Sequence, residues 1–263
     1  MSEVISSQGY NALLNDSGVL VKSPHTCSGI HVFGPDSDHT TLALTGLSLL
    51  ASKHEIESVC LEGEIDDIAL QACGYSIEPE SNWTIYCGQD ASVSISNGDP
   101  IEAEFPGKEM DSEKHDALVN AWNEESSAVS QGAFISEQAY KTGSMSRLSF
   151  ASQELGEMII WPPREMIGDQ RPVDSQSLKH SGVIESWTRL SAGGAPSEFS
   201  IRAPILGGIS TVFVRLDDGP RGVFLVADDE EKVPEIDGKV TFSVRRLYIQ
   251  EGLMRYGLKA LLQ

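Results

Sequence analysis

The run Ile209-Ser-Thr-Val-Phe-Val-Arg-Leu216, the turn Asp217-Asp-Gly-Pro220 and the run Gly222-Val-Phe-Leu-Val226 decide how the second half of the chain is expected to fold. Alternate residues of the first run share one face of a strand: Val212, Val214 and Leu216. Gly219 in the turn can adopt a positive φ without steric cost. The sequence therefore predicts a β-hairpin over residues 209–226.

Two further runs have the same strand-like composition, Gly182-Val-Ile-Glu-Ser-Trp-Thr-Arg-Leu190 and Val240-Thr-Phe-Ser-Val-Arg-Arg-Leu-Tyr-Ile249. The tail from Glu251 to Gln263 is rich in apolar residues, and we expect it to form the last strand. The alternative for the tail is a partly exposed patch that docks a partner. Five short strands favour a small closed barrel, because closure removes the sheet edges that would otherwise pair between molecules.

Several short motifs in this half carry a family resemblance through their order and spacing. They are Pro162-Pro163-Arg164, Gly182-Val-Ile-Glu-Ser-Trp-Thr188, Ala203-Pro204, Val214-Arg-Leu-Asp-Asp-Gly219 and Ile236-Asp-Gly-Lys-Val240. Together they resemble the acyl-CoA-associated OB-fold family, catalogued as domain of unknown function thirty-five, over about Met145 to Ile249. The resemblance implies a zinc ribbon followed by an OB-fold barrel, in a subunit beside a thiolase or 3-hydroxy-3-methylglutaryl-CoA (HMG-CoA) synthase that helps to hold CoA or acyl-CoA.

The chain departs from the family at the zinc-binding positions. The family pattern would place four zinc ligands at Ser152, Leu155, Ile167 and Gln170, and none of these is Cys or His. Structural zinc needs four thiolate or imidazole ligands, so we expect a metal-free, degenerate ribbon arm. Its order is expected to come from the local packing of apolar residues: Leu155, Met158, Ile159, Ile160, Trp161, Met166 and Ile167.

CoA presents an adenine ring, phosphate groups and a flexible apolar arm, so its site needs cationic forks and a flat or apolar surface. Arginine suits bidentate phosphate contacts better than lysine does. The candidate CoA-binding residues are Pro163, Arg164, Trp187, Arg202, Arg221 and Arg246. Arg164 is the preferred candidate, because two prolines fix the backbone before it. For any one of the arginines the alternative is a solvated side chain that balances nearby acids, and a tryptophan such as Trp187 is more often a core residue than a ligand platform.

The first half of the chain reads as an α/β layer. A helix is predicted over 38–53 with Asp38 as its cap, a strand over 57–62, a helix over 66–73 and a strand over 83–87. Gly88–Ser96 resembles the Gly-Asp-Ala strand of the thiolase superfamily. Trp122 with Gly132–Tyr140 resembles a stretch of archaeal-type HMG-CoA synthases.

The cysteines are Cys27, Cys60, Cys73 and Cys87, and no C-x-x-C spacing relates them. Buried free thiols are the expected reading. The alternative is a thiolase-like acyl-transfer enzyme in which Cys73 is the nucleophile, with a base among His25, His31, His39 and His54. About 140 residues are too few for a complete thiolase-fold synthase, so the favoured reading is a non-catalytic subunit.

Charge divides the chain. Residues 1–143 carry 5 basic and 23 acidic residues, a net charge of −18, whereas residues 144–263 carry 14 and 16, a net charge of −2. The predicted domains are therefore an acidic α/β domain at 1–143, the arm at 144–180 and the OB-fold domain at 181–263. Acidic surface repels polyanions, so single-strand nucleic-acid binding is a disfavoured alternative. The sequence has no membrane span or signal-peptide pattern, and a cytoplasmic location is expected.

Overall fold

The computed structural model describes residues 3–127, 137–250 and 252–263, without the side chains of residues 137–142 and 192. The chain divides into two compact units. The first is Met1–Asn123 with Val244–Arg246, and the second is Glu124–Ser243 with Leu247–Gln263. The division falls at Asn123, earlier than the change in composition at residue 143. Charge density reports on solvated surface rather than on packing, so the composition marked a different point of the chain.

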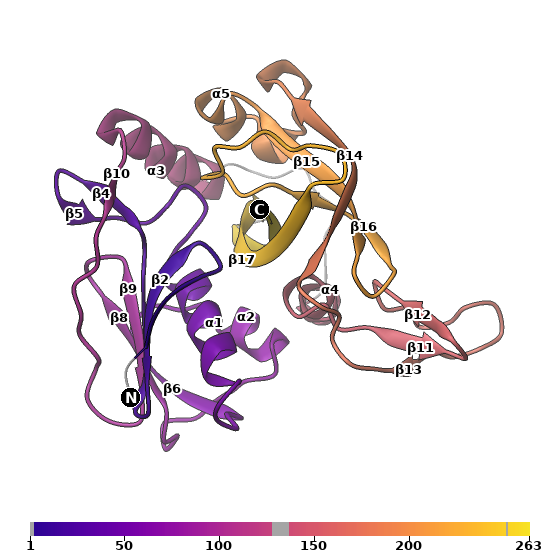
Figure 1. Cartoon of the computed structure of the whole chain (residues 1–263), viewed down its shortest axis with the longest axis horizontal. Helices are drawn as coiled ribbons and strands as arrows, with labels where there is room; N and C mark the ends of the chain where they lie inside the picture. Colours follow the sequence, from indigo (N-terminus) through magenta and orange to yellow (C-terminus); the bar gives the residue numbers. More distant parts are fainter. Residues whose placement is uncertain (1–2, 128–136, 251) are drawn as a thin grey trace. The chain divides into compact units, whose positions relative to one another are not determined.

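A seven-stranded sheet organises the first unit (Figure 1). Its spatial order is β1 (Glu3–Ser7), β2 (Tyr10–Asn15), β3 (Gly18–Lys22), β9 (Ser92–Ser96), β8 (Thr84–Gly88), β6 (Ser58–Glu62) and β7 (Ser76–Ile77). Strand β6 pairs in parallel with β7 and β8, and the other pairs are antiparallel. The predicted strands at 57–62 and 83–87 are confirmed as β6 and β8.

Helix α1 (His39–Leu50) packs against β3 and β9. The predicted cap is confirmed: Asp38 accepts a hydrogen bond from the backbone N–H of Thr41 at 3.0 Å, and the Thr41 hydroxyl accepts one from the N–H of Asp38. A Cβ on Gly46 would lie 2.9 Å from Cδ1 of Ile95, so the missing side chain lets the helix approach the sheet closely. The second predicted helix is α2 (Asp67–Ala72), which Asp66 caps.

The segment after β9 crosses the face of the sheet that carries the Ser94 and Ser96 side chains. The backbone N–H of Ile101 donates to the Ser94 hydroxyl at 2.7 Å, and the Ser96 hydroxyl donates to the Asp99 carbonyl at 2.9 Å. A small sheet with the order β10 (Lys108–Glu109), β4 (His25–Cys27) and β5 (Ile30–His31) follows, and then helix α3 (Ser112–Ser127). No strand before residue 57 was predicted, so β1 to β5 are additions to the expected layer.

A five-stranded sheet organises the second unit, in the order β16 (Arg221–Leu225), β15 (Ile209–Leu216), β14 (Ser181–Leu190), β17 (Lys239–Gln250) and β18 (Leu253–Leu262). All four predicted runs and the tail are confirmed as strands. The predicted inward face of β15, with Val212, Val214 and Leu216, is fully buried. Beyond the end of β16, Val226 forms a parallel bridge with Ala260 of β18. The remaining elements are helix α4 (Glu137–Leu148), short helices at Ala192–Gly194 and Ser197–Phe199, and α5 (Arg202–Leu206).

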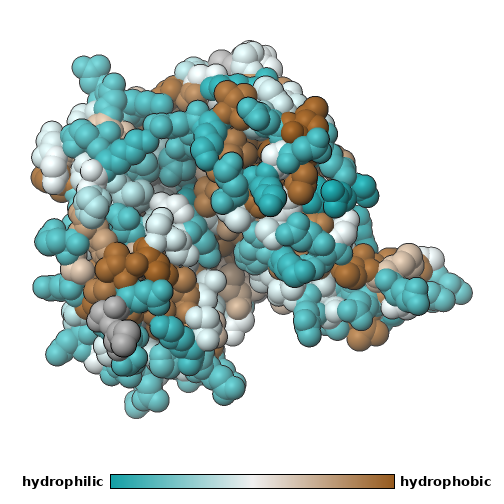
Figure 2. All heavy atoms as spheres, in the orientation of Figure 1, coloured by the Kyte–Doolittle hydropathy of each residue, from teal (hydrophilic) through white to brown (hydrophobic). Residues whose placement is uncertain are grey.

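The arm forms a separate three-stranded sheet with the order β12 (Met158–Ile160), β11 (Gln153–Leu155) and β13 (Val173–Asp174). Three residues expected to pack inside it are instead exposed: Met158, Ile159 and Met166. Figure 2 shows hydrophobic spheres on this arm. For these three residues the packing prediction is wrong, because three short strands are too thin to bury both of their faces. No helix in the described ranges is long and apolar enough to cross a bilayer.

Candidate functional site

An aromatic cluster attaches the arm to the five-stranded sheet. The Trp161 ring stacks on Phe224 of β16, with ring centroids 5.6 Å apart, and meets Phe150 edge-on at 5.4 Å. A Cβ on Gly222 would lie 2.5 Å from Cζ3 of Trp161. The glycine therefore makes room for the indole, and the base of the arm is held against β16.

Arg164 lies on the arm, three residues after this anchor. Its backbone N–H donates to Oε1 of Gln153 at 2.8 Å, which ties the Pro-Pro-Arg segment to β11. The Arg164 side chain is exposed and Pro163 is half-buried. Within the described part of the chain, no carboxylate or carbonyl pairs with the Arg164 guanidinium. The structure thus presents a cation on a fixed backbone with its donors turned to solvent.

Trp187 of β14 and Arg221 of β16 lie in the same sheet, with β15 between their strands. Trp187 of β14 faces Val212 across the sheet and keeps 40% of its surface exposed. Arg221 donates to Oε2 of Glu185 at 2.8 Å, while Arg215 donates to Oε1 at 3.2 Å. The hydrogen bond from Arg221 lowers the pKa of the Glu185 carboxyl. Arg221 is therefore engaged in an exposed ion pair, and Trp187 is the more accessible of the two for a ligand.

Arg202 belongs to the interior of the second unit, where it is fully buried. It donates to the Glu125 carboxylate at 2.9 Å, to Asp228 at 3.3 Å and to the Leu247 carbonyl at 2.9 Å. Lys259, also buried, donates to the other oxygen of Asp228 at 2.8 Å. Two cations and two carboxylates neutralise one another there. Arg202 is therefore a structural residue of the interior and not an exposed ligand-binding residue.

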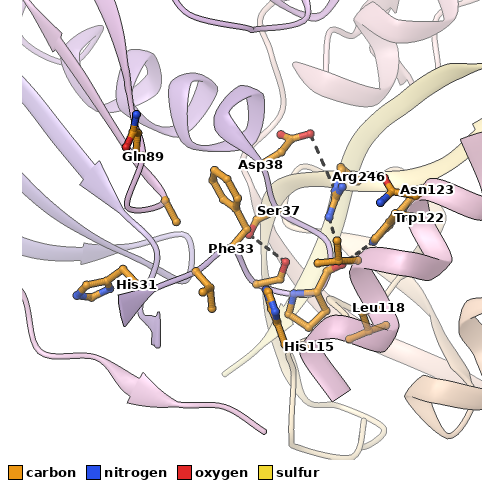
Figure 3. A pocket seen from close by; sticks show the side chains of 15 residues that line it. His31, Phe33, Ser37, Asp38, Gln89, His115, Leu118, Trp122, Asn123 and Arg246 are labelled. Atoms are coloured by element: carbon orange, nitrogen blue, oxygen red, sulfur yellow. Dashed lines mark hydrogen bonds and ion pairs between the residues drawn. The ribbon is translucent and has the colours of Figure 1, made fainter. Parts of the chain in front are cut away.

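Arg246 belongs to the first unit and lines a pocket with a volume of about 330 Å³. The walls come from the segment between β5 and α1, from the turn after β8 and from α3. In the view of Figure 3, Arg246, Asp38, Trp122 and Asn123 gather on one side of the pocket, while His31 and Gln89 lie on the other. The sequence identified Arg246 as a candidate CoA-binding residue, but no pattern in it predicted the pocket.

Several contacts hold the Arg246 side chain in place. Its guanidinium carbon lies 4.3 Å from the centroid of the Trp122 ring, a cation–π contact. The carbonyl of Pro35 accepts from the Trp122 indole at 2.7 Å and from Nη2 of Arg246 at 3.5 Å. Oδ2 of Asp38 lies 4.0 Å from Nε, beyond hydrogen-bond distance. The arginine is thus fixed with one planar face on the indole.

Cys73 is not placed as an activated nucleophile. It follows α2 as the cap of its carboxyl end, where the helix dipole disfavours a thiolate. Burial raises the pKa of its thiol to about 12. All four cysteines are free thiols of intermediate exposure, which places them nearer the surface than the expected core positions. Helix geometry and burial together argue against the acyl-transfer alternative that relies on Cys73.

The two stretches that resembled thiolase-superfamily enzymes are only partly described. The Gly88–Ser96 stretch is the end of β8, a turn and β9. Trp122 is a buried residue of α3. Of the Gly132–Tyr140 stretch, residues 132–136 lie outside the described residues, and the rest begins α4. In the ranges the structure covers, no group of three or more His, Cys, Asp or Glu side chains is arranged to hold a metal ion.

No known protein-family model matches the chain, and no curated protein does. Among solved structures, the chain is similar to one described as "Ltp2-ChsH2(DUF35) aldolase". That match has 15% sequence identity and a TM-score of 0.33, and it covers 49% of this chain and 98% of that chain.

Proposed function

We propose that the protein is a non-catalytic accessory subunit that binds CoA or an acyl-CoA beside an acyltransferase of the thiolase or HMG-CoA synthase type. The observation that carries this proposal is Arg164, whose exposed guanidinium has no partner among the described residues and whose backbone is tied to Gln153. A phosphate group of CoA would meet a donor fork that needs little further ordering. Pro163 stiffens the same segment.

The second unit is proposed to be an OB-fold barrel. Support comes from the sheet order, in which β14 lies centrally between β15 and β17. Further support comes from the parallel bridge between Val226 and Ala260, since it joins the two ends of the sheet. A barrel of this kind offers an outer surface on which the exposed Trp187 supplies a flat apolar face for an adenine ring.

In this proposal the protein contributes proximity rather than bond making. An acyl-CoA held by its nucleotide end on one subunit remains close to the active site of the next, which raises its effective concentration. The position of Cys73 fits this division of labour, because a thiol with a pKa of about 12 is almost entirely protonated at neutral pH. A net charge of −20 makes a nucleic-acid partner unfavourable.

Titration calorimetry with CoA and acetyl-CoA tests the binding step. We expect the Arg164→Ala substitution to weaken CoA binding about tenfold or more, the cost of one charge-assisted contact. The matched control is Arg171→Ala, which removes the same charge from another exposed position on the arm. Equal affinities of both variants and the unchanged protein would contradict the role of Arg164.

The partnership is tested separately, by purifying the tagged full chain from its native host and identifying what elutes with it by mass spectrometry. The expected companion is an acyl-CoA-processing enzyme present in stoichiometric amount. Recovery of the chain without such an enzyme, together with no heat of CoA binding, would overturn the proposed function as a whole.

A further inference from the structure

We infer that the pocket in the first unit is a binding site for a small carboxylate with an apolar body, anchored by Arg246. This site is separate from the CoA proposal in its residues and in its ligand. At about 30 Å³ per water molecule, 330 Å³ holds roughly ten waters. The pocket therefore suits a compact organic acid of about that many heavy atoms and not the full length of CoA.

The guanidinium of Arg246 leaves a donor for a ligand. Its Nη2 donates to the Pro35 carbonyl, and its Nε lies 4.0 Å from Oδ2 of Asp38. The third nitrogen, Nη1, has no acceptor in the described part of the chain. The side chain retains 16% exposure, and it lines the pocket. A carboxylate oxygen is the acceptor that guanidinium binds most strongly.

The site is ordered before any ligand arrives. Trp122 covers one face of the guanidinium, and the backbone N–H of Arg246 donates to the Asp36 carbonyl at 2.8 Å. Asp36 is itself fully buried beside Arg245, with Oδ1 3.3 Å from Nε. A side chain fixed in this way loses little conformational entropy on binding, so more of the interaction energy appears as affinity.

The remaining walls decide the class of ligand. Val32, Phe33, Leu118 and Val119 line the pocket with apolar surface, which favours a hydrocarbon body. The Asp38 carboxylate, 4.0 Å from the arginine, disfavours a ligand with two negative charges such as a phosphate monoester. Gln89 supplies a polar contact for a further oxygen. A monocarboxylate satisfies these three conditions together.

Ligand-observed NMR titration of the full chain with benzoate, phenylacetate and isovalerate tests the inference. At least one of these acids is expected to bind with a Kd on the order of a millimolar or tighter, which is typical of ligands of this size. Benzamide, the neutral isostere of benzoate, is expected to bind at least about tenfold more weakly, because it loses the charge-assisted bond.

Three variants make the test specific. Arg246→Gln should weaken binding ten- to a hundredfold, roughly the range of one charged hydrogen bond. Lys239→Gln removes the same charge from an exposed position on the same strand and should leave binding unchanged. Val119→Phe fills the pocket from a residue that is 45% exposed, so it should fold normally and reduce binding.

The inference is wrong if none of the three acids binds at millimolar concentration, or if benzamide binds as well as benzoate. It is also wrong if both Arg246→Gln and Val119→Phe bind with unchanged affinity. Because CoA binding is measured with Arg164 variants, failure of the pocket and failure of the CoA proposal give different results.

Discussion

Arg202 donates from Nε to both carboxylate oxygens of Glu125, at 2.9 and 3.0 Å, in the interior of the second unit. The pair joins α3 to α5, and Asp228 and Lys259 extend it into a chain of four charges. Burying charge is costly unless each group keeps a partner. The contact is therefore sensitive to the loss of either member.

Replacing Arg202 with Met is expected to lower the free energy of unfolding of the second unit by about 3–5 kcal/mol, because Glu125 loses its buried partner. Urea denaturation monitored by circular dichroism measures the change. The control is Arg215→Met, which breaks an exposed ion pair with Glu185 and should leave the transition nearly unchanged. Equal midpoints for the two variants would show that the buried network contributes no stability.

The contact between Gly222 and Trp161 predicts how firmly the arm is attached. Gly222→Ala places a methyl group where the indole lies, so we expect the arm to loosen at a cost of about 1–3 kcal/mol. Limited trypsin digestion should then cut faster after Arg164. Gly193→Ala serves as the control, because a Cβ there meets no atom of the described residues within 4 Å. An unchanged cleavage rate in Gly222→Ala would mean that the stacking does not restrain the arm.

Cys73 is expected to react slowly with iodoacetamide in the folded protein. At about pH 8.5 an ordinary thiol is half ionised, whereas a pKa of about 12 leaves less than roughly one molecule in a thousand as thiolate. Mass spectrometry of the peptide containing Cys73, with and without urea, measures the difference. Rapid labelling of Cys73 in the native protein would revive it as a candidate nucleophile.

Alkaline pH is expected to destabilise the first unit. Burial raises the pKa of Cys73 and of Tyr75 to about 12, so the folded state retains protons that the unfolded chain releases. This contribution is complete below the unfolded thiol pKa of about 8.5 and is lost as the pH rises toward 12. Between about pH 7.5 and about pH 10 the free energy of unfolding, measured by urea denaturation, should therefore fall less in Cys73→Ser than in the unchanged protein, by up to about 2 kcal/mol. A pH dependence identical in both proteins would contradict this assignment.

Strand β15 could be predicted because its burial follows the alternation of its residues. In β15 the buried positions Val212, Val214 and Leu216 are also the alternating apolar ones. Strand β3 behaves differently, since all of Gly18–Lys22 is buried and no alternation marks it. A strand covered on both faces leaves no period-two signal, and this is why β3 was not predicted.

The candidate site was less predictable, because it depends on residues that are distant in sequence. Arg202 was assigned to ligand binding from its residue type, but its partners Glu125 and Asp228 come from other segments and make it an interior group. Arg246 was assigned to the CoA site of the OB-fold domain, whereas folding places it in the first unit, against Trp122. The restraint predicted for the Arg164 backbone is local, since it depends on the two prolines directly before the residue.

Strand β17 has a consequence for the order in which the protein is made. Its residues Val244–Arg246 belong to the first unit, where Arg245 meets Asp36 and Arg246 meets Trp122. On the ribosome, residues 3–123 emerge long before these arginines are synthesised. The first unit must therefore wait, with Asp36 still lacking Arg245, until nearly the whole chain has been translated, and a fragment released at Asn123 should be prone to degradation.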